Sequence, residues 1–136
     1  MLSQSVSSPI DPKQSTPIDL IEYARDELSG LPTIRRNKEH TMTFERDSSG
    51  QPITVGLAVQ GTLNRRTGVI TSTIKFDPNR TIGFGHTHPL NGEPGIGPLD
   101  DVGPKQTGLP SFVRGSTLRI FLIENVEGTI SVIPLN

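Results

Sequence analysis

Cysteine is absent from this chain of 136 residues. Its absence excludes disulfide bridges, cysteine nucleophiles, iron–sulfur clusters and zinc sites with thiolate ligands. Long apolar runs are missing too, because none approaches the ~20 residues that a membrane-spanning helix needs. We therefore expect no membrane partner, and the chemistry of the chain must come from histidines, carboxylates and hydroxyls.

An excess of charge of either sign is also missing. The chain has 13 basic and 14 acidic residues, which gives a formal net charge of −1. Nucleic-acid-binding proteins usually carry a concentrated positive field, and this composition provides none. The basic pairs at 35–36 and 65–66 are isolated, so we interpret them as solvated surface. No nucleic-acid partner is expected.

The composition predicts one domain behind a short leader. Residues 1–14 are polar and rich in Ser and Pro, and they have too few bulky apolar groups to offset the entropy of ordering. We predict a disordered leader there and a single domain over residues 15–136. The leader has no apolar signal core. The sequence therefore leaves open whether the domain is cytoplasmic or is delivered elsewhere as an effector.

One helix is expected near the beginning of the domain. Thr16 can cap it and Pro17 suits its first turn. Gly30 and Pro32 mark its end. A single apolar stripe predicts that the helix packs on a sheet. The stripe consists of Ile18, Ile21, Ala24 and Leu28.

Short runs rich in Val, Ile and Thr, separated by Gly, Pro and Asp turns, predict many strands after this helix. We expect strands at 41–44, 53–60, 69–76, 81–85, 111–113, 119–124 and 129–133. Residues 90–110 hold five Gly and four Pro, so we predict that this stretch is mostly loop. One helix followed by many strands indicates an α+β domain with a mainly antiparallel sheet.

The segment Gly85-His86-Thr87-His88-Pro89 carries the strongest chemical signal. In an extended strand, residues two apart point to the same face, so His86 and His88 can bind one ion together. Imidazole is a good zinc ligand. A catalytic zinc normally has three protein ligands and keeps one position for water. The spacing therefore predicts a site for one Zn²⁺ ion.

The remaining groups of such a site must be carboxylates, because cysteine is absent. Asp100 and Asp101 follow in the Gly/Pro-rich loop, which can fold back onto the histidines. Either aspartate can be the third ligand. A general base is also needed, and a glutamate near the metal is the usual choice. We select Glu39, at the start of the first strand. His40 is expected to face the other side of the sheet.

These residues resemble the JAB/MPN (JAMM) metallopeptidase domain family, whose signature is a distant Glu, then His-x-His-Pro, then Ser-x-x-Asp. His86, His88 and Pro89 match His-x-His-Pro, and "PLDDV" matches the last element. "EHTMTFERDSSG" is similar to the Glu-bearing strand of JAB domains in bacterial polymorphic toxins, and "TGLPSFV" is similar to the strand after the loop. The resemblance covers roughly residues 16–134.

The resemblance implies a JAB/MPN-like fold and zinc-dependent hydrolysis of peptide or isopeptide bonds. It implies His86, His88 and Asp101 as zinc ligands and Glu39 as the catalytic base. The chain departs from the family at Pro98, which stands where the family has Ser and offers neither a hydroxyl nor an N–H. Loss of one such donor typically costs about 100-fold in rate. The loop from His88 to Asp101 is also about two residues longer than the compact family pattern.

Three functional hypotheses follow. The first is a zinc metallopeptidase that acts on a protein or peptide substrate presented in extended form. The second is an interaction module on the same fold, catalytically weak or inactive, because Pro98 replaces the family Ser. The third concerns biological role: a bacterial toxin or effector domain, with a cognate immunity or partner protein. The third hypothesis is compatible with the first.

Overall fold

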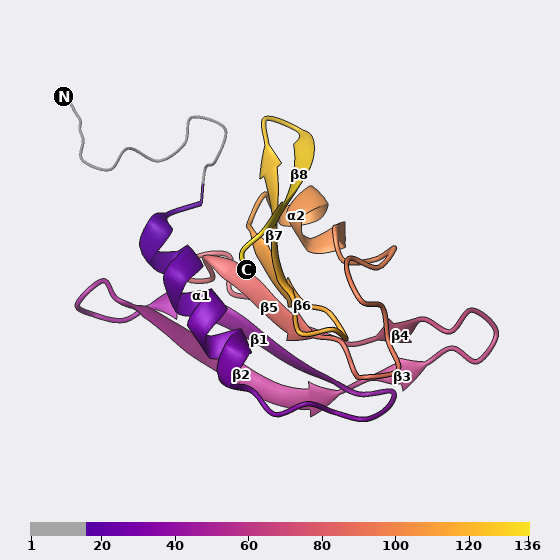
Figure 1. Ribbon diagram of the computed structural model, residues 1–136. Coiled ribbons are helices and arrows are strands. Elements are labelled where there is room, and N and C mark those ends of the chain that lie inside the picture. Colours follow the sequence, from indigo (N-terminus) through magenta and orange to yellow (C-terminus); the bar gives the residue numbers. More distant parts are fainter. Residues whose placement is uncertain (1–15) are drawn as a thin grey trace.

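A computed structural model describes residues 16–136 (Figure 1). The leader predicted for residues 1–14 lies outside the described residues. The elements are a long helix, a six-stranded sheet, a small two-stranded arm and a short second helix. Their bounds are α1 Ile18–Gly30, β1 Glu39–Arg46, β2 Pro52–Gln60, β3 Thr62–Leu63, β4 Ile70–Thr71, β5 Gly83–Thr87, α2 Val102–Thr107, β6 Ser111–Arg114, β7 Ile120–Val126 and β8 Thr129–Pro134.

The predicted α+β class with a mostly antiparallel sheet is confirmed. The main sheet has the order β2-β1-β5-β6-β7-β8, and β3 pairs with β4 in a separate two-stranded sheet. All pairs in the main sheet are antiparallel except β5 with β6. A parallel pair needs a long crossover connection, often with a helix in it. Residues 88–110 are that crossover, and they carry α2. No described helix is long and apolar enough to cross a membrane.

Helix α1 covers one face of the sheet, as predicted (Figure 1). Of the predicted apolar stripe, Ile18 is exposed, and Leu20 is buried in addition to the other three residues. The core under it includes Phe44 of β1 and Phe112 of β6, whose rings meet edge to face with centroids 5.8 Å apart. Gly85 of β5 makes this packing possible, because a Cβ there would lie 3.0 Å from the Phe44 ring. Three helix residues, Leu20, Ala24 and Leu28, are fully buried. The core therefore lies directly behind the strand that carries the histidines.

The predicted start of α1 needs one correction. Pro17 rather than Thr16 is the residue at the N-cap, and it makes no side-chain cap. Thr16 is buried and donates from its backbone N and its Oγ1 to Oε2 of Glu124, at 3.2 and 2.6 Å. A carboxylate from β7 thus fixes the beginning of the helix. A local cap was the wrong interpretation because the partner lies 108 residues away in sequence.

Two further expectations differ from the structure. The strand expected at 69–76 is only Ile70–Thr71, which pairs with β3 in an arm beside the main sheet. Within the stretch expected to be mostly loop, Val102–Thr107 forms α2. Pro104 is tolerated there because the N–H groups of a first helical turn have no helical partner anyway. Gly108 ends α2 with a φ of +74°. The Pro and Gly content of this stretch concealed a helix this short.

Candidate metal centre

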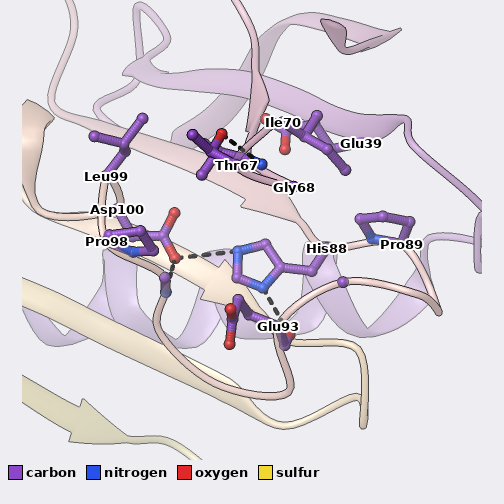
Figure 2. A pocket seen from close by; sticks show the side chains of 13 residues that line it. Glu39, Thr67, Gly68, Ile70, His88, Pro89, Glu93, Pro98, Leu99 and Asp100 are labelled. Carbon is purple, nitrogen blue, oxygen red and sulfur yellow. Dashed lines mark hydrogen bonds and ion pairs between the residues drawn. The ribbon is translucent and has the colours of Figure 1, made fainter. Parts of the chain in front are cut away.

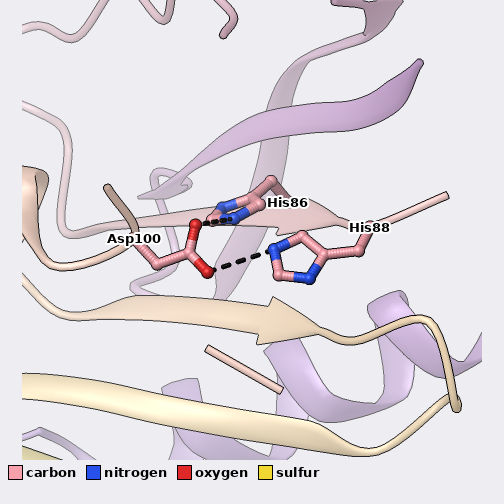
Figure 3. Close-up of side chains that lie close together, drawn as sticks. All are labelled: His86, His88 and Asp100. Atoms are coloured by element: carbon pink, nitrogen blue, oxygen red, sulfur yellow. Dashed lines mark hydrogen bonds and ion pairs between the residues drawn. The ribbon is translucent and has the colours of Figure 1, made fainter. Parts of the chain in front are cut away.

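His86 lies in β5 and His88 directly follows the last residue of that strand, Thr87; both are on the sheet face opposite α1. His86 pairs with Thr41 of β1 and with Val113 of β6, so β5 is held on both sides. The His86 and His88 rings have centroids 5.3 Å apart. Both side chains are largely buried. The predicted convergence of the two imidazoles on one face is therefore present (Figure 3).

Asp100 completes the cluster from the crossover loop. One of its carboxylate oxygens lies 2.9 Å from Nε2 of His86 and the other lies 3.1 Å from Nε2 of His88. Among residues 16–136 these three side chains form the only group of this kind able to hold a metal ion, with ligand atoms all within 4.8 Å of one another. The carboxylate thus bridges both imidazoles (Figure 3).

The choice of Asp101 as the third ligand is corrected by this geometry. Asp101 stands at the N-cap of α2, and its carboxylate forms an ion pair with Lys105 at 2.9 Å. The start of α2 turns neighbouring side chains in different directions, and this sends Asp100 rather than Asp101 toward the histidines. The correction also moves the comparison with Ser-x-x-Asp. With Asp100 as the Asp, the Ser position falls on Gly97 instead of Pro98.

Hydrogen bonds from the loop orient both acidic and basic ligands. The backbone N of Gly97 donates to Oδ2 of Asp100 at 2.7 Å. Nδ1 of His88 lies 2.9 Å from the carbonyl oxygen of Glu93. A carbonyl can only accept, so this contact places the proton of neutral His88 on Nδ1 and leaves Nε2 free to bind a metal. Outer contacts of this kind fix the tautomer and ring orientation of metal-binding histidines.

Within the cluster, Asp100 and the histidines each favour the charged form of the other. Burial alone would raise the pKa of Asp100, but its hydrogen bonds with His86 and His88 hold that pKa well below its usual range. Burial alone would lower the pKa of His88, but the hydrogen bond and charge of Asp100 outweigh it, and the pKa is raised. Without a metal, the site therefore favours a carboxylate facing a protonated imidazole.

Glu39 lies where the sequence predicted, at the first residue of β1. It is 9% exposed and lines the same cavity as His88 and Asp100. Burial raises the pKa of its carboxyl, while the nearby His86 and His88 partly offset that rise. A carboxyl with a raised pKa in a cleft with these partners is suited to proton transfer.

A cavity of about 180 Å³ opens beside this cluster. One wall comes from the β3–β4 arm through Thr67–Ile70, and another comes from the loop through Pro98 and Leu99 (Figure 2). Glu39 and Asp100 are both in its lining, with His88 between Asp100 and the Glu93 carbonyl (Figure 2). Ligand pockets are usually larger than about 300 Å³, so this space suits a few atoms of a chain rather than a whole small molecule.

The face of β5 toward α1 contains a polar contact that sequence reasoning missed. Thr87 stands between His86 and His88 in the sequence. Its hydroxyl accepts a hydrogen bond from the backbone N of His40 at 3.1 Å and lies 3.2 Å from Nδ1 of the His40 ring. Both residues are buried. His40 thus faces away from Glu39, as expected. Burial, and then the charge of Arg114, lower the pKa of His40.

Arg114 extends this contact. Its Nη1 donates to the carbonyl oxygens of Leu28 and Leu31 at the end of α1, both at 2.7 Å. Burial lowers the pKa of this guanidinium. The Thr between the histidines was the only sequence signal for the contact, since a hydroxyl on the core side of a strand requires a partner. The His40–Thr87 contact joins the segment with Glu39 to the segment with the histidines.

Comparison of the chain with known proteins identifies no relative. No family model matches the chain, and no curated protein matches it. The resemblance to the JAB/MPN family therefore stays a prediction that depends on the motif residues.

Proposed function

We propose that this domain is a zinc-dependent hydrolase that cleaves a peptide or isopeptide bond. The observation that carries the proposal is the convergence of His86, His88 and Asp100 beside a buried Glu39 in one cavity. Two imidazole nitrogens and one carboxylate oxygen are a ligand set typical of catalytic zinc, which keeps a position for water. This donor set fits the ion, and no thiolate is required.

Each of the four site residues has a distinct role in this reaction. His86 and His88 offer their Nε2 atoms and Asp100 offers its carboxylate. When bound there, zinc supplies a Lewis acid and lowers the pKa of a coordinated water to about 7. The Glu39 carboxylate accepts a proton from the hydrolytic water and passes it to the nitrogen of the leaving amine. The raised pKa of Glu39 suits both proton transfers, because its carboxylate binds a proton more tightly than an exposed glutamate does.

The cavity favours a substrate in extended form. Val69 and Ile70 on one side and Pro98 and Leu99 on the other leave a narrow space beside His88. About 180 Å³ accommodates a short stretch of main chain with small side chains. An unfolded segment or a chain terminus meets this requirement.

The deciding experiment compares three variants after zinc loading. His88→Ala should lose both zinc and turnover, whereas Glu39→Gln should keep its zinc and lose turnover by at least about 100-fold. Glu22→Gln, on the exposed side of α1, is the matched control and should behave like the wild type. Zinc is measured by elemental analysis and turnover with a peptide library. Full activity of Glu39→Gln would contradict the assigned base.

A second function deserves the same test, because the site offers no side-chain hydroxyl at the Gly97 and Pro98 positions. In that alternative the domain binds a partner protein and cleaves nothing. Chelation of zinc would then leave partner binding unchanged, and no peptide would be cut. Cleavage that stops on chelation and returns with zinc would exclude this alternative.

A further inference from the structure

Ser72, directly after β4, has a hydroxyl that the fold leaves without a partner. Its Oγ is buried and makes no hydrogen bond. It is one of only three buried side-chain polar atoms in this condition among residues 16–136. A buried group without a partner costs free energy, so each one requires an explanation. Ser72 alone of the three lies in the arm that borders the candidate metal centre.

The chain holds the Ser72 segment in place with one side chain. The Gln60 amide binds Thr73 in both directions: its Nε2 donates to the Thr73 carbonyl at 2.8 Å, and its Oε1 accepts from the Thr73 backbone N at 3.3 Å. Gln60 Nε2 also donates to Oγ1 of Thr41 at 2.7 Å. In the β1–β2 ladder, Gln60 is the partner of Glu39. The amide therefore joins the Ser72 segment to the beginning of β1.

This placement brings Ser72 to Glu39. The hydroxyl lies near enough to the Glu39 carboxyl to lower its pKa, although no hydrogen bond of good geometry joins the two groups. Ile70, two residues earlier on the arm, lines the cavity together with Glu39. The hydroxyls of Thr41 and Thr67 each accept a hydrogen bond, from Gln60 Nε2 and from the Val69 backbone N. The Ser72 hydroxyl is the one that the described fold leaves buried with no partner of either kind.

We propose that Ser72 is a positioning residue whose hydroxyl donates a hydrogen bond to one oxygen of Glu39 in the working site. The bond fixes the rotation of the carboxylate, so that its other oxygen faces the cavity beside His88 and Asp100. This inference rests on the proposed function.

The test uses Ser72→Ala, Ser72→Thr and the control Thr73→Ala, all in the full chain. Thr73→Ala keeps the backbone groups that Gln60 binds and should behave like the wild type. Ser72→Ala should lower kcat by about 10–100-fold, as expected for an outer contact that orients a reactive group, with little change in KM and full zinc content. Ser72→Thr keeps the hydroxyl and should recover most of kcat.

A thermal unfolding measurement on the zinc-free proteins separates this role from a structural one. Removal of an unpartnered buried hydroxyl should leave the Tm of Ser72→Ala unchanged or raised. If Tm and kcat fall together, or if Ser72→Ala matches Thr73→Ala in kcat, the inference is wrong while the proposed function stands. A wild-type protein that takes up no zinc or cleaves no peptide overturns the proposed function, and the inference with it.

Discussion

Strand β5 and the loop after it both present metal-binding groups, but the fold holds these two segments very differently. β5 is paired on both sides, with β1 and β6, and the core under α1 packs directly behind it. The loop that carries Asp100 is tied down by single contacts, such as Ser116 N to the Glu93 carbonyl at 2.9 Å. His86 therefore belongs to the rigid framework, and His88 follows directly after it, held by the hydrogen bond from its backbone N to the Arg114 carbonyl at 2.7 Å. Asp100 belongs to the loop.

This difference indicates separate roles for the paired strand and for the loop. Groups on paired strands are fixed by many cooperative bonds, whereas a loop opens locally at a lower free energy. The framework can fix the distance between the two imidazoles whether or not a metal is bound. The loop then closes the site by bringing Asp100 to both of them. Variants in the two segments should separate the fold from the metal site.

The largest effect should come from the loop ligand. Asp100→Asn should weaken zinc binding by more than about 100-fold, because even outer contacts of metal ligands are worth 10–100-fold. Asp101→Asn is the matched control: it removes only a partly exposed ion pair with Lys105, a type of contact worth about 0–1 kcal/mol. Zinc titration against a competing chelator measures both. Equal loss in the two variants would show that the loop ligand has been assigned incorrectly.

The next effect concerns the framework. Thr87→Val keeps the shape of the side chain but leaves the buried N–H of His40 without its acceptor. We expect the free energy of unfolding to fall by about 1–3 kcal/mol, with or without zinc. Urea unfolding of the zinc-free protein measures the change. Thr87→Ser should remain close to the wild type, and a similar loss in both variants would assign the effect to packing instead of the hydrogen bond.

A smaller effect on zinc affinity should follow from a substitution that displaces the loop but changes none of the three proposed metal ligands. A Cβ on Gly115 would overlap the carbonyl oxygen of Pro94, so Gly115→Ala must displace the loop next to Glu93. The carbonyl of Glu93 orients His88, and zinc binding should therefore weaken by about tenfold while the β5 pairing stays intact. Gly95→Ala is the control, since its Cβ would have only ordinary contact with Phe121. Unchanged zinc affinity in Gly115→Ala would mean that the loop adapts freely.

The same division explains what the sequence could predict. The alternation of side chains along a strand placed His86 and His88 on one face, and this prediction needed no knowledge of the partners. Glu39 was selected as the glutamate at the start of the first strand after the helix; it lines the cavity with His88 and Asp100, and its role as base stays a prediction. The choice between Asp100 and Asp101 depended on where α2 begins, and a helix of six residues that contains Gly and Pro has almost no periodic signal.

Residues that act through distant partners were beyond sequence reasoning. Ser72 is one of several hydroxyl residues in the 69–76 segment, and only the burial of its unpartnered Oγ, beside the contacts of Gln60 with the next residue, Thr73, singles it out. Thr87 was visible between the histidines, but its partner His40 is 47 residues away. Neither contact follows from composition or local periodicity, because both depend on which strands pair and in which register.

The smallest expected effect is a pH dependence whose direction reverses with the metal. In the zinc-free protein the pKa of Asp100 is lowered, so its contribution to stability is present above its usual value of 3.8 and is lost as the pH falls toward the folded pKa. The pKa of His88 is raised, so its contribution is full below the usual 6.5 and is lost as the pH rises through the folded value. The zinc-free protein should thus gain most from this pair between those two pH values.

Zinc requires neutral imidazoles, so binding should instead strengthen as the pH rises above that window. Thermal unfolding from pH 4 to 8 with and without zinc, at about one-unit steps, should therefore show opposite slopes near neutrality. Asp100→Asn should flatten the zinc-free profile, and Asp101→Asn should leave it unchanged. Parallel slopes with and without zinc would mean that the metal binds elsewhere, because protons and zinc would then no longer compete for the same Nε2 atoms.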